Sequence, residues 1–314
     1  MGKIAFVFPG QGSQTVGMGK DLYEKYACAR KVFEEADAAL GFSITDMCFE
    51  GPEEELKKTF NTQPAILTVS IACYEVLKEQ ELTPDIVAGH SLGEYSALVA
   101  AGALSFGDAV RLVRKRGQFM QEAVPLGEGS MAAILGLDRQ SIIDICKQVE
   151  AEYGAVQAVN FNCPGQVVIA GTATAVEKAA EALKSAGAKR TVMLPVSAPF
   201  HSTLMQPAAV KLAAELDKVV VSNAKIPVVA NLTGRMITSS SDIKPSLVAQ
   251  ADHPVRWEDC VAEIIGYGAD VFVEVGPGKV LTGFTKKITK EVLAHNVEGI
   301  DSLEKTLDYF KEVR

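Results

Sequence analysis

A serine between two glycines is the clearest reactive group of this sequence. Residues 89–93 have the pattern G-x-S-x-G, and they stand between a short apolar segment, 85–89, and a helix-like segment, 92–101. The glycines permit a sharp turn, and the serine hydroxyl then lies above the free N–H groups of the next helix. The pattern predicts that Ser91 is a nucleophile that carries an acyl group, with the main-chain N–H of Leu92 as an oxyanion donor. An ordinary turn with a serine helix cap is the alternative.

A glycine-rich loop, residues 9–13, follows the first apolar segment, 4–8. It lacks the third glycine of the dinucleotide motif and the Gly-Lys-Ser/Thr of the phosphate loop, which argues against nucleotide binding. The loop is expected at the carboxyl end of a parallel strand, where ligands of such sheets bind. There Gln11 could supply a second oxyanion N–H. From the spacing alone, a surface turn residue is an equally good interpretation of Gln11.

A serine nucleophile needs a base that accepts its proton. His90 is part of the turn itself, which leaves His201, His253 and His295. His201 follows Pro199 in a loop at a predicted domain junction, a place that commonly borders a cleft. A lone histidine is more often structural than catalytic, and the residues alone favour His201 only slightly.

The rival base is His295, which comes after a late strand in the sequence. In the hydrolase order Ser…Asp/Glu…His it would pair with Asp270 or Glu274. This interpretation makes the protein a thioesterase or a lipase-like esterase. The serine turn by itself does not exclude it.

The order of the segments predicts an α/β fold with two domains. Strand-like and helix-like segments alternate in residues 1–126 and again in 198–314, which indicates an α/β-hydrolase-like catalytic domain with a parallel sheet covered by helices on both faces. One of these helices is expected over 64–78, with Pro64 in its first turn. Residues 127–197 have the order β-α-β-β-α-β, which predicts an inserted ferredoxin-like small domain.

The composition excludes several classes of protein. The 314 residues are 48% hydrophobic and 22% charged, and the net charge of −8 disfavours nucleic-acid binding. No apolar stretch has the length of a membrane span, and no signal or transit segment precedes the first strand. Six scattered cysteines and four separated histidines form no metal-ligand pattern. We therefore expect a cytoplasmic protein without a bound metal, membrane or nucleic acid.

Six short motifs are distributed along the whole chain. They are FPGQGSQ (8–14), NTQPA (61–65), GHSLGE (89–94), RG (116–117), FH (200–201) and EVGPG (274–278). As a set, they resemble those of the malonyl-CoA:acyl carrier protein transacylases, an acyltransferase family of fatty acid synthesis. The resemblance implies transfer of a malonyl group through a malonyl-serine intermediate, with ping-pong kinetics and no cofactor.

The resemblance also assigns the catalytic residues. It implies that Ser91 is the nucleophile, His201 its base, and the N–H groups of Gln11 and Leu92 the oxyanion hole. It places the backbone carbonyl of Gln250 beside His201, in the role of a triad carboxylate.

The resemblance further implies that Arg116 binds the malonyl carboxylate, because a guanidinium matches a carboxylate bidentately. A supporting role for Gln63 on this side of the pocket is one interpretation, and a polar residue near a helix start is the plainer one. Phe200 resembles the residue of malonyl-selecting members. Other basic residues on the helix of Arg116 are expected to form a solvated face: Arg111, Arg114 and Lys115.

The implied partners are malonyl-CoA and phosphopantetheinylated acyl carrier protein. Because both proteins would be acidic, docking needs a local basic patch. The candidates are Lys286, Lys287 and Lys290 on a late helix, and Lys189 and Arg190 at the small-domain edge. A rival of another class is a scaffold that binds acyl carrier protein without catalysis, against which Ser91 and His201 argue.

Overall fold

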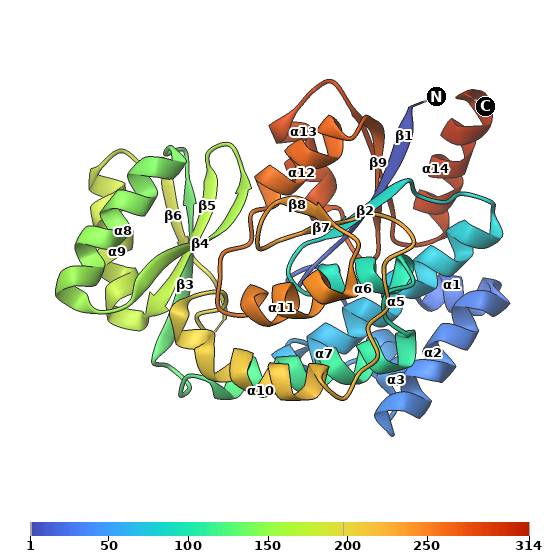
Figure 1. The fold of residues 1–314 in the computed structure, drawn as a ribbon, viewed down its shortest axis with the longest axis horizontal. Helices are drawn as coiled ribbons and strands as arrows, with labels where there is room; N and C mark the ends of the chain where they lie inside the picture. The colour runs from blue at the N-terminus through green and yellow to red at the C-terminus, as the bar shows by residue number, and fades with distance from the viewer. Residues whose placement is uncertain (1, 197, 314) are drawn as a thin grey trace.

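A six-stranded, mostly parallel sheet forms the centre of the larger part of the molecule in the computed structural model, which describes residues 2–196 and 198–313 (Figure 1). The strand order is β10-β9-β1-β2-β7-β8, and only β8 runs antiparallel to its neighbour. The strands are β1 (Lys3–Phe8), β2 (Ile86–Gly89), β7 (Val228–Ala230), β8 (Arg235–Ile237), β9 (Ala269–Val275) and β10 (Leu293–Val297). The predicted α/β class with a parallel sheet is thus confirmed.

Side chains of β1 alternate between two hydrophobic cores, as the pleat of a strand requires. Phe6 and Phe8 face one core, and Ala5 and Val7 face the other. The first core lies under α1 (Lys20–Lys25), α2 (Ala27–Leu40), α3 (Ile44–Glu50), α4 (Glu53–Leu56), α5 (Thr59–Glu79), α6 (Gly93–Ala100), α7 (Phe106–Glu122), α10 (Gln206–Leu216), α11 (Ser240–Gln250) and α14 (Ile300–Val313). The second lies under α12 (Trp257–Gly266) and α13 (Val280–Ile288). Both faces of the sheet are therefore covered by helices.

The carboxyl ends of β1 and β2 meet at one edge of the sheet. Phe8 pairs with Gly89, and the N–H of His90 donates to the carbonyl of Phe8 at 3.0 Å. A side chain at residue 93 would not fit, because a Cβ on Gly93 would lie 2.1 Å from the carbonyl oxygen of Phe8. The close approach brings the loop 9–13 against the turn that holds Ser91.

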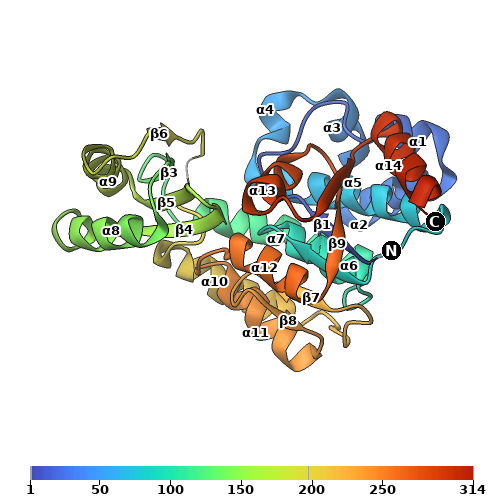
Figure 2. The ribbon, with the colours of Figure 1, turned by 90° about the horizontal axis from the view of Figure 1, so that it is seen from above.

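A separate four-stranded antiparallel sheet lies at one end of the molecule (Figures 1 and 2). Its order is β4-β5-β3-β6, and α8 (Arg139–Tyr153) and α9 (Ala173–Ser185) pack on it around a third core. The strands are β3 (Gly129–Leu135), β4 (Val156–Cys163), β5 (Gln166–Thr172) and β6 (Arg190–Met193). Val255 of the larger part bonds to Val159 and Phe161 at 2.8 and 2.9 Å, which fixes β4 beside the large sheet. Residue 197, predicted to end the small domain, lies outside the described residues.

The structure corrects two expectations about α5 and α7. Helix α5 begins at Thr59, so Pro64 lies in its interior and not in its first turn. Because proline has no N–H, it cannot bond to the carbonyl of Phe60 one turn earlier. The guanidinium of Arg114 donates to that carbonyl instead, at 2.8 Å, and also to the side chain of Asn61. Arg114 is therefore half-buried and structural, and the prediction that it belongs to a solvated face was wrong.

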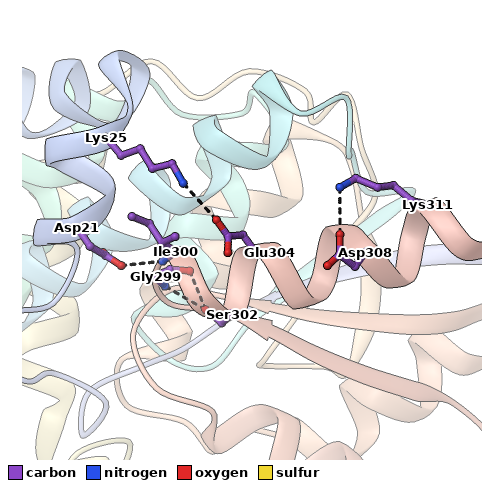
Figure 3. A network of polar contacts seen from close by, with 8 residues as sticks. All are labelled: Asp21, Lys25, Gly299, Ile300, Ser302, Glu304, Asp308 and Lys311. Atoms are coloured by element: carbon purple, nitrogen blue, oxygen red, sulfur yellow. Dashed lines mark hydrogen bonds and ion pairs between the residues drawn. The ribbon is translucent and has the colours of Figure 1, made fainter.

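The first and last helices of the chain are joined by polar contacts (Figure 3). The carboxylate of Asp21 in α1 accepts the N–H of Ile300 at 2.7 Å, and Lys25 pairs with Glu304 at 3.2 Å.

Within the described residues, no helix combines the length and the apolar character that a membrane crossing requires. His295 comes after the late strand β9, as expected, and lies inside the next strand, β10.

Candidate active site

Ser91 stands at a strained turn between β2 and α6. Its φ of 53° lies in the left-handed region that residues with a side chain seldom adopt. The turn is tight enough that a Cβ on Gly89 would lie 1.9 Å from the main chain of Gly93. Such strain costs on the order of 1–3 kcal/mol and persists only where surrounding contacts enforce it. The turn therefore needs a support outside its own residues.

Asn231, directly after β7, provides that support. Its Oδ1 accepts the N–H of Ser91 at 2.7 Å, and its Nδ2 donates to the carbonyl of Gly89 at 2.7 Å. Its own N–H donates to Oε2 of Glu94 at 3.0 Å. The sequence analysis missed Asn231. A signal existed, because an asparagine that ends an apolar strand lies at the carboxyl edge where ligand sites form.

His201 lies against the hydroxyl of Ser91. The Nε2 atom is 2.7 Å from the serine Oγ, and Nδ1 is 2.8 Å from the backbone carbonyl of Gln250. Since a carbonyl can only accept, Nδ1 carries the proton and Nε2 is free to accept that of the serine. His201 also has a positive φ, 64°, so both halves of this pair are held in a strained backbone conformation.

Burial keeps the imidazole of His201 neutral. The loss of solvent around the ring, followed by the positive charge of Arg116, lowers its pKa to about 3. A neutral ring at physiological pH is the form that can accept a proton from serine. The ring is oriented by the carbonyl of Gln250, a neutral group, and not by a carboxylate.

Arg116 of α7 is 1% exposed and points at the nucleophile. Its Nη2 lies 3.2 Å from the Oγ of Ser91 and donates to Oε1 of Gln250 at 3.0 Å, while Nη1 donates to Oε1 of Gln63 at 2.8 Å. The guanidinium carbon lies 5.5 Å from the ring centre of Tyr95. Gln63 and Gln250 are neutral acceptors, so this cation is available to an anionic group placed beside Ser91.

A cavity of about 110 Å³ opens in front of Ser91. Gln11 and Leu92 line it, and neither main-chain N–H has a partner among the described residues. Phe200 forms part of its apolar wall. The other lining residues are Gln63, His90, Ser91, Arg116, Met120, Met131, Asn160, Leu194, Val196 and His201. The cavity thus brings together every catalytic and malonyl-binding residue assigned from the sequence except Gln250, which lies behind His201.

A second cavity, of about 230 Å³, adjoins the first and shares four lining residues with it: Gln11, His90, Asn160 and Leu194. Its walls come from the loop 9–13, from the small sheet and from α13 through Val280, Leu281 and Phe284. His90 Nε2 lies 2.9 Å from Oδ1 of Asn162, which ties the turn to β4. Together the two cavities form a path between the sheets to Ser91.

The rival triad residues lie in other surroundings. Glu274 accepts the N–H groups of Leu281 and Thr282 at 3.0 and 2.7 Å, and so caps α13. The ring of His295 stacks on Tyr309 with centres 4.5 Å apart. Asp270 accepts the N–H of Gly2 at 3.2 Å. The structure brings Ser91 to His201 and gives these three residues partners elsewhere.

Comparison with known proteins agrees with this geometry. The family model described as acyl transferase domain matches residues 5–306. The chain is 52% identical to the malonyl CoA-acyl carrier protein transacylase of Bacillus subtilis, over 99% of this chain and 98% of that protein. It is similar to the crystal structure of the Clostridium perfringens transacylase, with a TM-score of 0.96 and 43% identity over 99% and 98% of the two chains. It also matches a malonyl-transacylase in complex with its type II PKS acyl carrier protein, with a TM-score of 0.95 and 47% identity over 98% and 99%.

Proposed function

The chain belongs to the acyl transferase family, and from this premise we propose how its residues carry out malonyl transfer. It is a malonyl-CoA:acyl carrier protein transacylase, which moves a malonyl group from coenzyme A to the phosphopantetheine thiol of acyl carrier protein in fatty acid synthesis. The single observation that carries the assignment of roles is the 2.7 Å contact between Ser91 and His201, with a buried arginine on the other side of the hydroxyl.

In the first half-reaction, Ser91 attacks the malonyl thioester while His201 takes its proton. The N–H groups of Gln11 and Leu92 donate to the oxyanion, and one such donor is typically worth about a hundredfold in rate. The carbonyl of Gln250 holds the imidazole in the required tautomer and stabilises it when it becomes charged. The sulfur of coenzyme A then leaves with the proton from His201, and malonyl remains as an ester on Ser91.

The second half-reaction reverses these roles with a new thiol. His201 takes the proton of the phosphopantetheine thiol, whose sulfur attacks the malonyl ester in the same oxyanion hole. Ser91 recovers its proton and its hydroxyl when the thioester forms. Because the first thiol must leave before the second can enter the same path to Ser91, the kinetics are ping-pong.

Arg116 selects the malonyl group in this proposal. A carboxylate two carbons from the reacting carbonyl reaches the guanidinium when the carbonyl lies at Ser91, which is 3.2 Å from Nη2. The cation is buried, so its attraction for an anion is little screened by water. Gln63 holds the other nitrogen of the fork, and Phe200 limits the room beside the malonyl methylene.

The architecture supports a division of labour between two domains. We infer an α/β-hydrolase-like catalytic domain, 1–126 and 198–314, and a ferredoxin-like small domain, 127–197, which closes the path to Ser91. The order β4-β5-β3-β6 with two helices on one face supports the second assignment. The six cysteines are free thiols, which suits the reducing cytoplasm that we infer as the site of action.

We propose that acyl carrier protein docks beside α13. This helix contributes Leu281 and Phe284 to the outer cavity and carries Lys286 and Lys287 in its last turn. The Nζ of Lys287 lies 3.4 Å from Oε1 of Gln166 on the small sheet, so it bridges the two sides of the path. An acidic partner placed there would bring its phosphopantetheine arm to the opening.

The adduct on Ser91 tests the proposed function. Incubation with malonyl-CoA should add one malonyl group to the intact protein, and peptide mass spectrometry should locate it on residues 89–93. Ser91→Ala should show no adduct, while Ser96→Ala, which changes another serine five residues further along in α6, should still form it. A malonyl adduct on another residue, or hydrolysis of malonyl-CoA with no transfer to acyl carrier protein, would contradict the proposal.

A further inference from the structure

A buried carboxylate that the two half-reactions do not use lies behind the active site. Glu94 of α6 is 0% exposed, and its Oε2 accepts Nε2 of Gln250 at 2.8 Å as well as the N–H of Asn231 at 3.0 Å. The same Gln250 side chain accepts Nη2 of Arg116 through its Oε1 at 3.0 Å. One amide therefore joins the carboxylate of Glu94 to the cation that faces the substrate.

Arg116 is the one positive charge that acts on Glu94 among the residues that the structure describes. Two other ionisable side chains interact with the charge of Glu94: Tyr95 on the same helix and Cys260 of α12. Burial raises the pKa of Tyr95 to about 12 and that of Cys260 well above its usual value, so both are neutral. His201, the other nearby base, is neutral as well. Without substrate, Arg116 and an ionised Glu94 balance each other.

The malonyl carboxylate disturbs this balance. When it docks on Arg116, two carboxylates share one cation in a site without bulk solvent. The second negative charge then favours protonation of the carboxylate that interacts less strongly with Arg116. The malonyl carboxylate contacts the guanidinium directly, whereas Glu94 reaches it only through Gln250. We propose, on the basis of the malonyl transfer described above, that Glu94 takes up a proton when malonyl is loaded and releases it when malonyl leaves.

The structure provides a place for that proton. Oε1 of Glu94 is buried and has no hydrogen-bond partner among the described residues, so a proton bound there breaks no existing contact. Oε2 keeps both of its donors, Gln250 and Asn231. Burial, partly offset by these donors and by Arg116, raises the pKa of Glu94 to about 7. Glu94 thus acts on the substrate only through Gln250 and Arg116, as a positioning residue that adjusts the charge of the pocket.

The acyl exchange itself neither consumes nor releases a proton. The serine proton passes to His201 and then to the sulfur of coenzyme A, while the bond between carbonyl carbon and sulfur is replaced by one to the serine oxygen. Ionisation of the coenzyme A thiol releases the same fraction of a proton for every acyl group. A proton taken from solvent with malonyl-CoA, and not with acetyl-CoA, therefore reports a group that responds to the extra carboxylate.

Proton uptake during acylation is the decisive measurement. Enzyme and malonyl-CoA are mixed in weak buffer with a pH indicator at about pH 8, one unit above the pKa of Glu94, and malonyl-serine is counted by mass spectrometry. The wild type should take up most of one proton per malonyl-serine, and none with acetyl-CoA after correction for the thiol. Its KM for malonyl-CoA should rise above pH 7, by up to about tenfold per pH unit at full coupling.

Two glutamate variants test whether the proton uptake belongs to Glu94 or arises from any buried glutamate. Glu94→Gln keeps an oxygen for Asn231 and Gln250, and it should form malonyl-serine without proton uptake and with a flat KM profile. Glu274→Gln alters another buried glutamate whose pKa is raised to about 7, and it should take up protons like the wild type. Uptake that persists in Glu94→Gln, or that is lost equally in both variants, overturns the proposal.

The wild type alone provides a second test if Glu94→Gln fails to fold. The infrared difference spectrum should show a protonated-carboxyl band on loading with malonyl-CoA, and not with acetyl-CoA, and the band should shift on 13C-glutamate labelling. Malonyl-serine formed without this band and without proton uptake refutes the role of Glu94 and leaves the transacylase function intact. Absence of malonyl-serine would refute the function itself.

Discussion

Two regions of the molecule each contain a buried glutamate and a histidine, and they differ in what surrounds the pair. Around Ser91, the histidine contacts a hydroxyl and a carbonyl, and Glu94 lies one amide away from a buried cation. On β9 and β10, Glu274 accepts two N–H groups of α13, and His295 stacks on Tyr309. Residue type alone therefore does not identify a catalytic pair.

The difference lies in which groups each pair leaves free. Nε2 of His201 and the guanidinium of Arg116 face an open cavity, whereas both oxygens of Glu274 are occupied by main-chain donors. A cavity of about 690 Å³ borders His295, but the N–H groups at the start of α14 beside it are already bonded, that of Ile300 to Asp21 and that of Gly299 to Ser302. The second region holds α13 in place, and through α13 it contributes to the entrance of the first.

Removal of each histidine should give the largest difference between the two regions. His201→Ala should lower kcat for malonyl transfer by about a thousandfold, the usual worth of a general base. His295→Ala should leave kcat within about twofold, because its ring packs on Tyr309 and lies away from the nucleophile. Transfer to acyl carrier protein measured under identical conditions decides this. A comparable loss in both variants would restore the hydrolase-type triad.

Removal of the buried cation should give the next largest effect. Arg116→Ala should cost malonyl transfer about 3 kcal/mol, roughly a hundredfold in kcat/KM, because a desolvated charge pair is lost. Acetyl transfer should fall far less, since acetyl has no carboxylate. Arg114→Ala is the matched control: it removes the neighbouring arginine, whose contacts are structural, and should lower stability without changing the malonyl-to-acetyl ratio. Equal losses for both acyl groups in Arg116→Ala would exclude carboxylate recognition.

Loss of the support behind the turn should have a smaller effect. Asn231→Ala removes the bonds to Ser91 and Gly89, and a misplaced nucleophile should lower kcat by about tenfold. Asn223→Ala is the control, because Asn223 also accepts a main-chain N–H, from Ser240, but on an exposed loop. Asn223→Ala should not change kcat. If Asn231→Ala lowers the melting temperature and leaves kcat unchanged, the asparagine supports the fold and not the site.

Much of this arrangement follows from local sequence, and some of it does not. The alternation of strands and helices, the sharp turn at Ser91 and the loop at Gln11 are set by apolar spacing and glycine, which act over a few residues. The base remained open between His201 and His295, and Gln250 was assigned only through the resemblance. Contacts among residues 91, 231 and 250 join distant segments, which no local pattern specifies. Pro64 was misplaced for the same reason, since its compensation comes from Arg114 on another helix.

Charge reversal on α13 should affect only the step that uses the protein partner. Lys287→Glu should raise KM for acyl carrier protein by about threefold at low salt, and less at high salt, because an exposed charge acts mainly through long-range attraction. Acylation of Ser91 by malonyl-CoA should not change. Lys31→Glu, at an exposed position of α2, provides the same change of charge away from the path. Equal effects of the two variants would place the docking surface elsewhere.

The smallest effect on activity is expected from Glu274, although stability should reveal its charge. Burial raises its pKa to about 7, so between about pH 4.5 and 7 the folded state keeps a proton that the unfolded chain has released. The free energy of unfolding must therefore fall as pH rises through this window. Glu274→Gln should make that fall shallower, with the remaining slope due to Glu94, whose pKa is raised in the same direction.

Urea unfolding at several values between about pH 5 and 8 measures this slope. Glu274→Gln should also lose about 1–3 kcal/mol throughout, since its NH₂ group faces one of the two main-chain donors of α13. Its kcat should match that of the wild type wherever it is folded, because neither half-reaction uses this carboxylate. A loss of kcat approaching that of His201→Ala would mean that the second region takes part in catalysis, whereas an unchanged slope would mean that the carboxyl of Glu274 ionises as freely in the folded protein as in the unfolded chain.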